Sequence, residues 1–129
     1  MEQSYRELQV WKKSVQLVKT VYLATAEFPA DELYGLRIQM RRAAVAIPSN
    51  IAEGQSRLSQ KELLHFLSNA KGSLAELETQ LTVSNELCLL GGEITRKLLK
   101  DCGEIGRLLS GLYDAIELRA GNREPRSKR

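Results

Sequence analysis

Apolar residues recur every three or four positions along almost the whole chain, and this spacing constrains the fold most. It places them on one face of an α-helix, whereas a half-buried strand would alternate at every second residue. Four such rows predict four helices. They consist of Leu8, Trp11, Val15, Val18, Tyr22 and Ala26; Leu33, Leu36, Met40, Ala43, Ile47 and Ile51; Leu63, Leu67, Ala70, Leu74, Leu77 and Leu81; and Ile94, Leu98, Ile105, Leu109, Leu112 and Ile116.

Capping and turn residues mark the ends of these helices. They are the capping-box pairs Ser4–Glu7 and Ser59–Glu62, a possible cap at Asp31, a stop at Phe28-Pro29 and a reversal at Gly91-Gly92. We therefore expect helices near 4–27, 32–55, 59–89 and 93–118. Short connections favour antiparallel neighbours, so the predicted fold is all-α, an antiparallel up-down-up-down four-helix bundle.

The net charge of +3 is unevenly distributed. Residues 119–129 hold five basic residues and one acid, so they carry +4, and residues 1–118 carry −1. We assign 1–118 to the bundle and 119–129 to a basic, disordered C-terminal tail. Because the bundle is nearly neutral, the overall basicity is weak support for a nucleic-acid-binding domain.

The cysteine count and the start of the chain predict a cytoplasmic location. The chain has two cysteines, Cys88 and Cys102, and begins MEQSYREL, which lacks the regions of a secretory signal. Both cysteines lie on or near the apolar rows and are expected to be small buried residues. No run approaches the roughly 20 apolar residues that a membrane span needs, so we expect no membrane partner.

The first helix is apolar on two rows. Beside the row given above runs a second one, made of Val10, Leu17, Val21, Ala24 and Phe28. A bundle helix needs only one buried stripe. The second row is therefore either part of a wide stripe in a monomer or a face buried against another subunit.

The second helix contains a proline where helices normally exclude it. Pro48 cannot donate to the carbonyl of Ala44, so it should kink the helix or start a new segment, with a break between Ala46 and Ser49. Asn50 falls on the core row, and we expect its amide to satisfy the backbone groups that Pro48 frees, or to fix register. A binding role for Asn50 is the alternative.

Three further residues near this segment have expected structural roles. Glu53 is spaced to pair with Arg57 four residues later, or with Arg42 across the kink. Gly72-Ser73 interrupts the third helix, where glycine costs about 1 kcal/mol against alanine. We therefore expect Gly72 to permit close packing against the kinked part of the second helix.

A group of cations is the candidate nucleic-acid site. Arg37 and Arg41 are four residues apart on one face, Arg42 lies beside them, and Arg57 and Lys61 could extend the strip. Arginine suits phosphate because its planar fork donates two parallel hydrogen bonds. The alternative is a solvated face that pairs with local acids. No aromatic residues interleave with the strip, so stacking of bases has no support.

The chain offers little for catalysis. Its one histidine, His65, is 23 residues from Cys88, about 34 Å along one helix, and Cys102 is expected to lie far from it as well. There is no metal-ligand spacing of cysteine and histidine and no glycine-rich phosphate loop. We predict no enzyme activity, no cofactor and no metal.

The motifs YRELQVWKKS, FPADELYGLRIQMRRAAVAIPSNIAEG and FLSNAKGSLAELETQL resemble the four-helix-bundle proteins encoded in bacterial 23S rRNA intervening sequences. The resemblance covers residue 5 to about 115, and its most specific part is Gln39–Arg42 followed by Ile47–Gly54. At Ala46 this chain departs from the serine usual in the family, which puts in doubt any site that uses that hydroxyl.

The resemblance implies an antiparallel bundle that assembles as a ring-shaped homopentamer. It favours the second of the two alternatives for the first helix, in which the second apolar row is buried against another subunit. The fold is also similar to that of accessory proteins of diversity-generating retroelements, which are basic pentamers that bind nucleic acid and a reverse transcriptase. Fold similarity alone does not assign that function here.

Three functional hypotheses follow. The leading one is a non-enzymatic, cytoplasmic, homo-oligomeric bundle that binds RNA or a nucleoprotein partner. The second is a protein-interaction scaffold ring without a nucleic-acid role. The third is an enzyme that uses Glu53 and Asn50 at a subunit junction.

Overall fold

The computed structural model describes residues 4–32 and 35–120, which form four long helices and two short 3₁₀ turns. The elements are η1 (Tyr5–Glu7), α1 (Gln9–Thr25), η2 (Ala30–Glu32), α2 (Leu36–Gln55), α3 (Gln60–Glu86) and α4 (Gly92–Ala120). This part of the chain contains no strand, which confirms the all-α four-helix fold. The predictions for the tail beyond Ala120 and for Leu33 fall outside the described residues.

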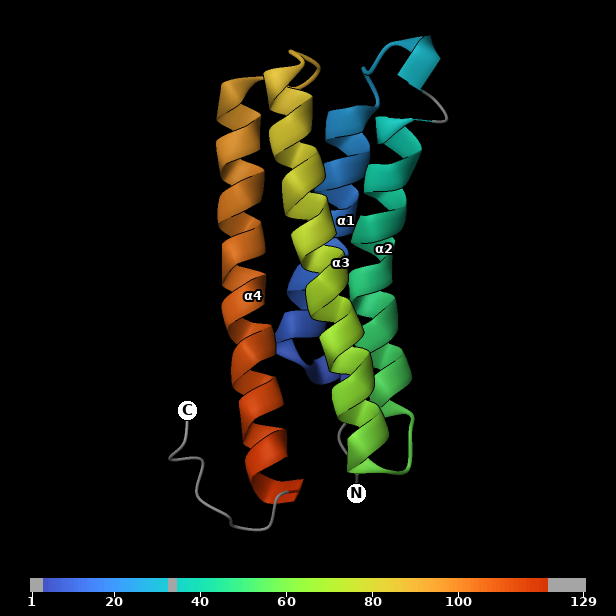
Figure 1. The fold of residues 1–129 in the computed structure, drawn as a ribbon, viewed down its shortest axis with the longest axis vertical. Helices are drawn as coiled ribbons and strands as arrows, with labels where there is room; N and C mark the ends of the chain where they lie inside the picture. Colours follow the sequence, from blue (N-terminus) through green and yellow to red (C-terminus); the bar gives the residue numbers. More distant parts are fainter. Residues whose placement is uncertain (1–3, 33–34, 121–129) are drawn as a thin grey trace.

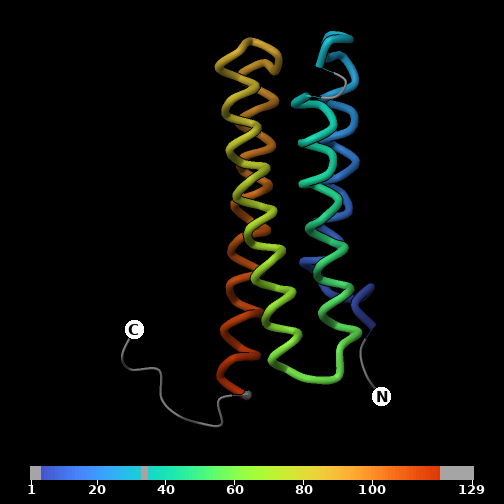
Figure 2. Tube along the Cα trace, turned by 45° about the vertical axis from the view of Figure 1, so that its right-hand side comes forward, coloured from blue at the N-terminus to red at the C-terminus, as the bar shows by residue number. Residues whose placement is uncertain are grey.

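Each helix packs against two others, so the bundle has four seams: α1–α2, α2–α3, α3–α4 and α1–α4. In Figure 1 the chain ascends in α1, descends in α2, ascends in α3 and descends in α4. Figure 2 shows the α1–α2 hairpin and the α3–α4 hairpin as two halves of the molecule. The α1–α2 seam and the α3–α4 seam therefore lie on opposite sides of the bundle.

The core is built from the predicted rows of α2, α3 and α4. Its fully buried large side chains in these helices include Met40, Ile47, Ile51, Leu67, Leu77, Leu81, Leu98, Ile105, Leu109 and Ile116. Burying a side chain of this size stabilises the fold by about 1.5–3 kcal/mol. None of the described helices is long and apolar enough to cross a membrane.

On α1 the buried row is the one expected to be secondary. Val10, Leu17 and Val21 are buried in the core, whereas Val15 and Tyr22 of the expected core row are exposed. Two polar residues, Ser14 and Thr25, complete the buried face, and their hydroxyls donate to the carbonyls of Val10 and Val21 four residues earlier. Because these bonds satisfy the hydroxyls locally, polar residues occupy a buried row at little cost.

The helix ends use some of the expected caps. Ser59 caps α3, since its hydroxyl accepts from the amide of Glu62 at 3.0 Å. At α2 the expected cap is wrong: Glu32, not Asp31, accepts from the amide of Leu36, also at 3.0 Å. The end of α3 is closed by Cys88, whose φ of 63° lets the following amide reach back to the carbonyl of Ser84. Cys88 is therefore exposed, and the expectation that it is buried is wrong.

The α2 helix passes through Pro48 without interruption. The expected break between Ala46 and Ser49 is therefore wrong, although a bend at Pro48 stays a prediction. Asn50 is half-buried, and its amide donates to the carbonyl of Ala46 at 2.8 Å rather than to that of Ala44. Asn50 thus bonds within its own turn and does not replace the hydrogen bond that Pro48 removes.

Gly54, not Gly72, is the glycine that permits close helix packing. A Cβ at Gly54 would lie 3.0 Å from Leu63 Cδ1 and 3.0 Å from Phe66 Cβ, so α2 and α3 are close together there. Gly72 is exposed, and a Cβ there would meet nothing within 4 Å. The expected contact of Gly72 with α2 is wrong, because residue 72 faces away from the core, and Ser73 is half-buried beside it.

Candidate functional site

Two of the candidate arginines donate hydrogen bonds to the last turn of α1 and to the residues just after it. Arg37 donates to the carbonyl of Phe28 at 2.6 Å, and Arg41 donates to the carbonyl of Tyr22 at 3.1 Å and to the hydroxyl of Thr25 at 2.9 Å. Carbonyls at a helix C-terminus lack partners within the helix, and a positive charge nearby is favourable. Arg37 and Arg41 therefore use part of their hydrogen-bonding capacity within the bundle, and a role for them in binding phosphate stays a prediction.

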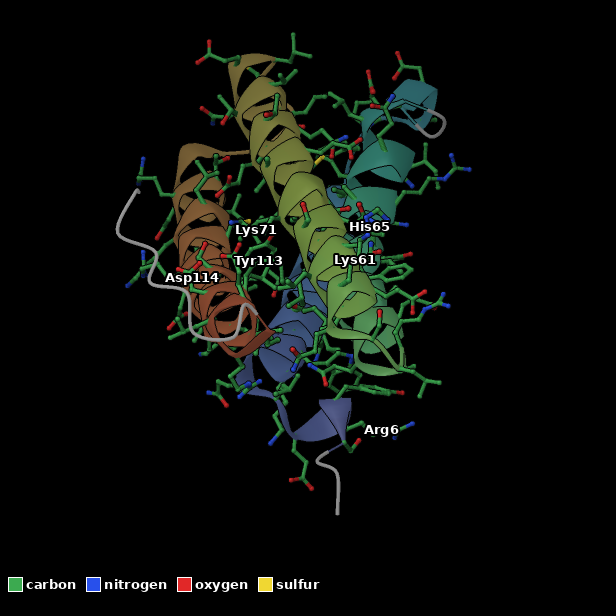
Figure 3. The ribbon with its side chains drawn as sticks, turned by 60° about the horizontal axis from the view of Figure 1, so that its bottom comes forward. Arg6, Lys61, His65, Lys71, Tyr113 and Asp114 are labelled. Atoms are coloured by element: carbon green, nitrogen blue, oxygen red, sulfur yellow. The ribbon has the colours of Figure 1, made fainter. Side chains whose placement is uncertain are left out.

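The other three candidates do not gather into one site. Arg42 is exposed on α2, and Arg57 and Lys61 lie at the α2–α3 connection. Arg57 forms an ion pair with Glu53, as expected, and also lies 4.9 Å from the centre of the Phe66 ring. In Figure 3, Lys61 and His65 lie on the first turns of α3, and they line a shallow hollow together with Arg57.

The most distinctive surface lies over the α1–α2 seam. We use the name α1–α2 face for four exposed apolar residues, each between 37% and 67% exposed: Val15, Tyr22 and Val45 beside the seam, and Leu23, which lies about 100° round α1 from Tyr22. Arg41 links the two helices at this face because its guanidinium lies over the Tyr22 ring, one turn from Val45. Three exposed cations, Lys12, Lys19 and Arg42, flank the face.

The sequence contained a signal for this face. Lys12, Val15, Lys19 and Tyr22 are spaced three or four apart, so they share one side of the helix. Lysine is almost never fully buried unless it is paired. The lysines therefore indicated that the row with Val15 and Tyr22 faces solvent, whereas we expected it to form the core.

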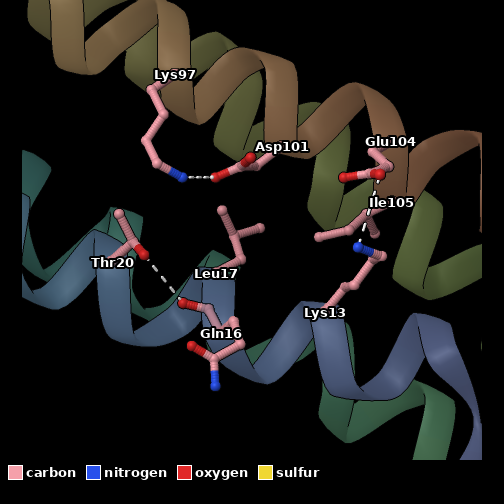
Figure 4. A pocket seen from close by; sticks show the side chains of 8 residues that line it. All are labelled: Lys13, Gln16, Leu17, Thr20, Lys97, Asp101, Glu104 and Ile105. Atoms are coloured by element: carbon pink, nitrogen blue, oxygen red, sulfur yellow. Dashed lines mark hydrogen bonds and ion pairs between the residues drawn. The ribbon is translucent and has the colours of Figure 1, made fainter.

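A cleft of about 230 Å³ lies at the α1–α4 seam (Figure 4). Leu17 and Ile105 line it together with two ion pairs, one between Lys13 and Glu104 at 3.6 Å and one between Lys97 and Asp101 at 2.6 Å. The formal charges of its two lysines and two acidic residues sum to zero. Its lining contains neither a thiol nor an imidazole, and the Lys13–Glu104 pair bridges α1 and α4.

The reactive side chains lie apart. Burial raises the pKa of the Cys102 thiol to about 12, with further contributions from the negative charges of Glu78 and Asp101. His65 is exposed and is 3.5 Å from the side-chain amide of Asn69. Within the described residues, no group of three or more histidine, cysteine or acidic side chains could hold a metal ion.

Residues 6–111 match the family described as 23S rRNA-intervening sequence protein. The chain belongs to this family. The match covers all of α1, α2 and α3 and most of α4, so the α1–α2 face lies within the family domain. No curated protein matches the sequence.

The expected signature segment of the 23S rRNA-intervening sequence proteins is mainly structural in this member. Its residues make contacts inside one subunit: Asn50 bonds within α2, Glu53 pairs with Arg57, and Gly54 packs on α3. Ala46, where the family resemblance led us to expect a serine, accepts the hydrogen bond of the Asn50 amide through its backbone carbonyl. The absent hydroxyl is not needed for that bond.

Proposed function

We propose that the protein is a non-enzymatic, cytoplasmic scaffold that self-associates through the α1–α2 face. One observation carries the proposal: α1 buries one apolar row in its own core and exposes Val15 and Tyr22 of its second row, together with Leu23 beside them, while Leu8, Trp11 and Val18 of the second row pack partly against the core. Contiguous exposed apolar residues rimmed by polar ones are typical of protein-interaction sites. A five-subunit ring is the assembly that the family resemblance suggests.

The composition of the face supports this proposal. Tyrosine, tryptophan and arginine are the residues that most often dominate the binding energy of protein interfaces. Tyr22 and Arg41 are stacked on one another at the centre of the face, and half-buried Trp11 lies further along α1, edge-on to Tyr5. These rings are held by contacts within the subunit, so little conformational entropy is lost when a partner binds.

Light scattering over a range of protein concentrations tests self-association. We expect the wild-type mass to be a multiple of 14.5 kDa, and a variant with Val15→Glu and Leu23→Glu to be a monomer with unchanged helical circular dichroism. The matched control is Leu58→Glu with Leu118→Glu, which places the same charges on exposed leucines outside the face. A monomeric wild type, or equal dissociation of both variants, would contradict the proposal.

Binding of RNA is a second candidate function. It is favoured by basic side chains that make no ion pair within the subunit. Among the described residues, Arg42 and Lys61 have no ion-pair partner, and the guanidinium of Arg57 lies 4.9 Å from the centre of the Phe66 ring, in a hollow that Lys61 and His65 also line. The basic residues after α4 would add to this charge. The structure offers fewer cations than the sequence suggested, because Arg37 and Arg41 are engaged with α1.

Titration of a labelled rRNA fragment across salt concentrations tests this second function. Each phosphate contact should contribute a slope of about 0.7 in log affinity against log salt for single-stranded RNA. The Arg42→Ala, Lys61→Ala variant should lower that slope, and Lys97→Ala is a control on another face. Absence of binding even at low salt would exclude RNA as a direct ligand.

A further inference from the structure

A hollow of about 470 Å³ lies along the α3–α4 seam. Gly103 and Gly106 line it from α4, and Ala75 lines it from α3. A Cβ at Gly103 would meet only the end of the Arg107 side chain, at 3.7 Å. The backbone of α4 is therefore open to the hollow at this point, and packing within the subunit leaves the space unfilled.

The lining of this hollow is apolar at its base and charged at its edges. Leu74 and Cys102 are its buried residues. Cys102 adds no charge, because burial raises the pKa of its thiol to about 12. The charged lining residues are Lys71, Arg107 and Glu78, so two cations against one acid give a formal charge of +1. Ligand pockets typically combine an apolar lining with a few charged groups that orient the ligand, and the space between the helices of a bundle is a usual place for them.

Arg107 is the side chain of the hollow best placed to hold an anion. It is exposed, and within the described residues it makes no hydrogen bond or ion pair. Its Nη1 is the atom nearest to a Cβ built at Gly103, so the guanidinium lies over the opening that the missing side chain leaves. A planar guanidinium donates two parallel hydrogen bonds to a carboxylate. Lys71 differs, because its ammonium lies 5.5 Å from the centre of the Tyr113 ring (Figure 3).

We propose that the hollow binds a small amphiphilic carboxylate, with the carboxylate on Arg107 and the apolar chain along α4 toward Ser110. The lining from Gly103 to Ser110 extends over roughly 10 Å of helix, which accommodates a short aliphatic chain. The chain would cover Leu74 and the backbone at Gly106, and removing this apolar surface from water favours binding. The hollow is separate from the α1–α2 face, so the proposal does not depend on self-association.

The charge of the head group distinguishes this ligand from other amphiphiles. Glu78 would attract an amine, but Lys71 and Arg107 outweigh it in the lining. We therefore expect octanoate to bind at least about tenfold more tightly than octylamine, which has the same chain and the opposite charge. Equal affinities would show that the chain alone adheres to the surface, and would overturn the proposal.

Nuclear magnetic resonance titration of the wild-type chain with octanoate locates the site. The amide signals of Gly103 and Gly106 should move and reach saturation. Those of Gly54 and Gly91, which lie outside the lining, should stay in place. If the signals of Gly103 and Gly106 do not move while octanoate is added, the hollow is not a binding site for this class of ligand.

Two variants test the two parts of the site. Gly103→Leu fills the hollow and should abolish saturable binding of octanoate. Its matched control is Gly72→Leu, at a glycine outside the lining where a Cβ would meet nothing within 4 Å. Arg107→Gln removes the charged donor from an exposed position, so it should leave the helical circular dichroism unchanged and weaken binding at least about tenfold. Wild-type affinity in either Gly103→Leu or Arg107→Gln would overturn the proposal.

Discussion

The guanidinium carbon of Arg41 lies 4.3 Å from the centre of the Tyr22 ring, and the same guanidinium donates to the Tyr22 backbone carbonyl. One side chain of α2 thus closes the last turn of α1 and holds an aromatic ring at the outer surface. The structure of the α1–α2 face therefore depends on a residue that the sequence suggested as a ligand for phosphate.

Replacing Arg41 should destabilise the fold, whereas replacing its neighbour should not. Arg41→Ala removes hydrogen bonds from a charged donor and leaves the Thr25 hydroxyl and the Tyr22 carbonyl without it, so we expect a loss of about 2 kcal/mol. Arg42→Ala should change stability by less than about 0.5 kcal/mol, because Arg42 is exposed. Urea unfolding of the two variants compares them, and equal stabilities would contradict the assigned role of Arg41.

Gly54 of α2 and Gly72 of α3 should respond in opposite directions to replacement by alanine. Gly54→Ala places a methyl group 3.3 Å from the backbone carbonyl oxygen of Leu63, which cannot move aside alone, so we expect a loss of about 1–3 kcal/mol. Gly72→Ala meets open space and removes the low helix propensity of glycine, so we expect a gain of up to about 1 kcal/mol. Thermal unfolding of both variants shows the signs directly.

The two cysteines should differ in reactivity. Cys88 is exposed, and Cys102 is fully buried with the pKa of its thiol raised to about 12. A thiol reagent at pH 8 should therefore modify one cysteine per folded chain rapidly and the second only after unfolding, since the thiolate is the reactive form. Rapid modification of both thiols in the folded protein would contradict the assigned burial.

Cys102 should also make stability fall at alkaline pH. In the unfolded chain its thiol ionises near its ordinary pKa of 9.0, but in the folded protein it stays protonated up to about 12. Between these values the unfolded state binds fewer protons, so the stability that is present below pH 9 declines by about 1.4 kcal/mol per pH unit. Cys102→Ala should show a shallower decline over pH 9–12, and parallel curves would contradict the shifted pKa.

The helices of this protein could be predicted from sequence because three of their four apolar rows have one clear period. Met40, Ile47, Leu67, Leu77 and Leu98 are buried where the spacing places them. On α1 two apolar rows compete, and period alone does not decide between them. Lys12 and Lys19 turn the outer side of the helix to solvent. The hydroxyls of Ser14 and Thr25 can be buried on the inner side because they bond to carbonyls of their own helix.

The candidate site was less predictable, because the partners of a side chain depend on packing between helices. Arg37 and Arg41 have the spacing of a basic strip, but the end of α1 and the residues after it lie beside them and accept one hydrogen bond from Arg37 and two from Arg41. The hollow along the α3–α4 seam is lined at ordinary helical spacing, by residues between 71 and 78 and between 102 and 110, so the period does not distinguish it from a filled seam. It exists because small residues from two helices meet at one seam.

The most direct test of the central claim is sedimentation equilibrium of the wild-type chain beside the Val15→Glu, Leu23→Glu variant. The account predicts an oligomer for the wild type and a folded monomer of 14.5 kDa for the variant. A wild-type chain that sediments as a monomer at every concentration, or a variant that keeps the wild-type mass, would contradict it.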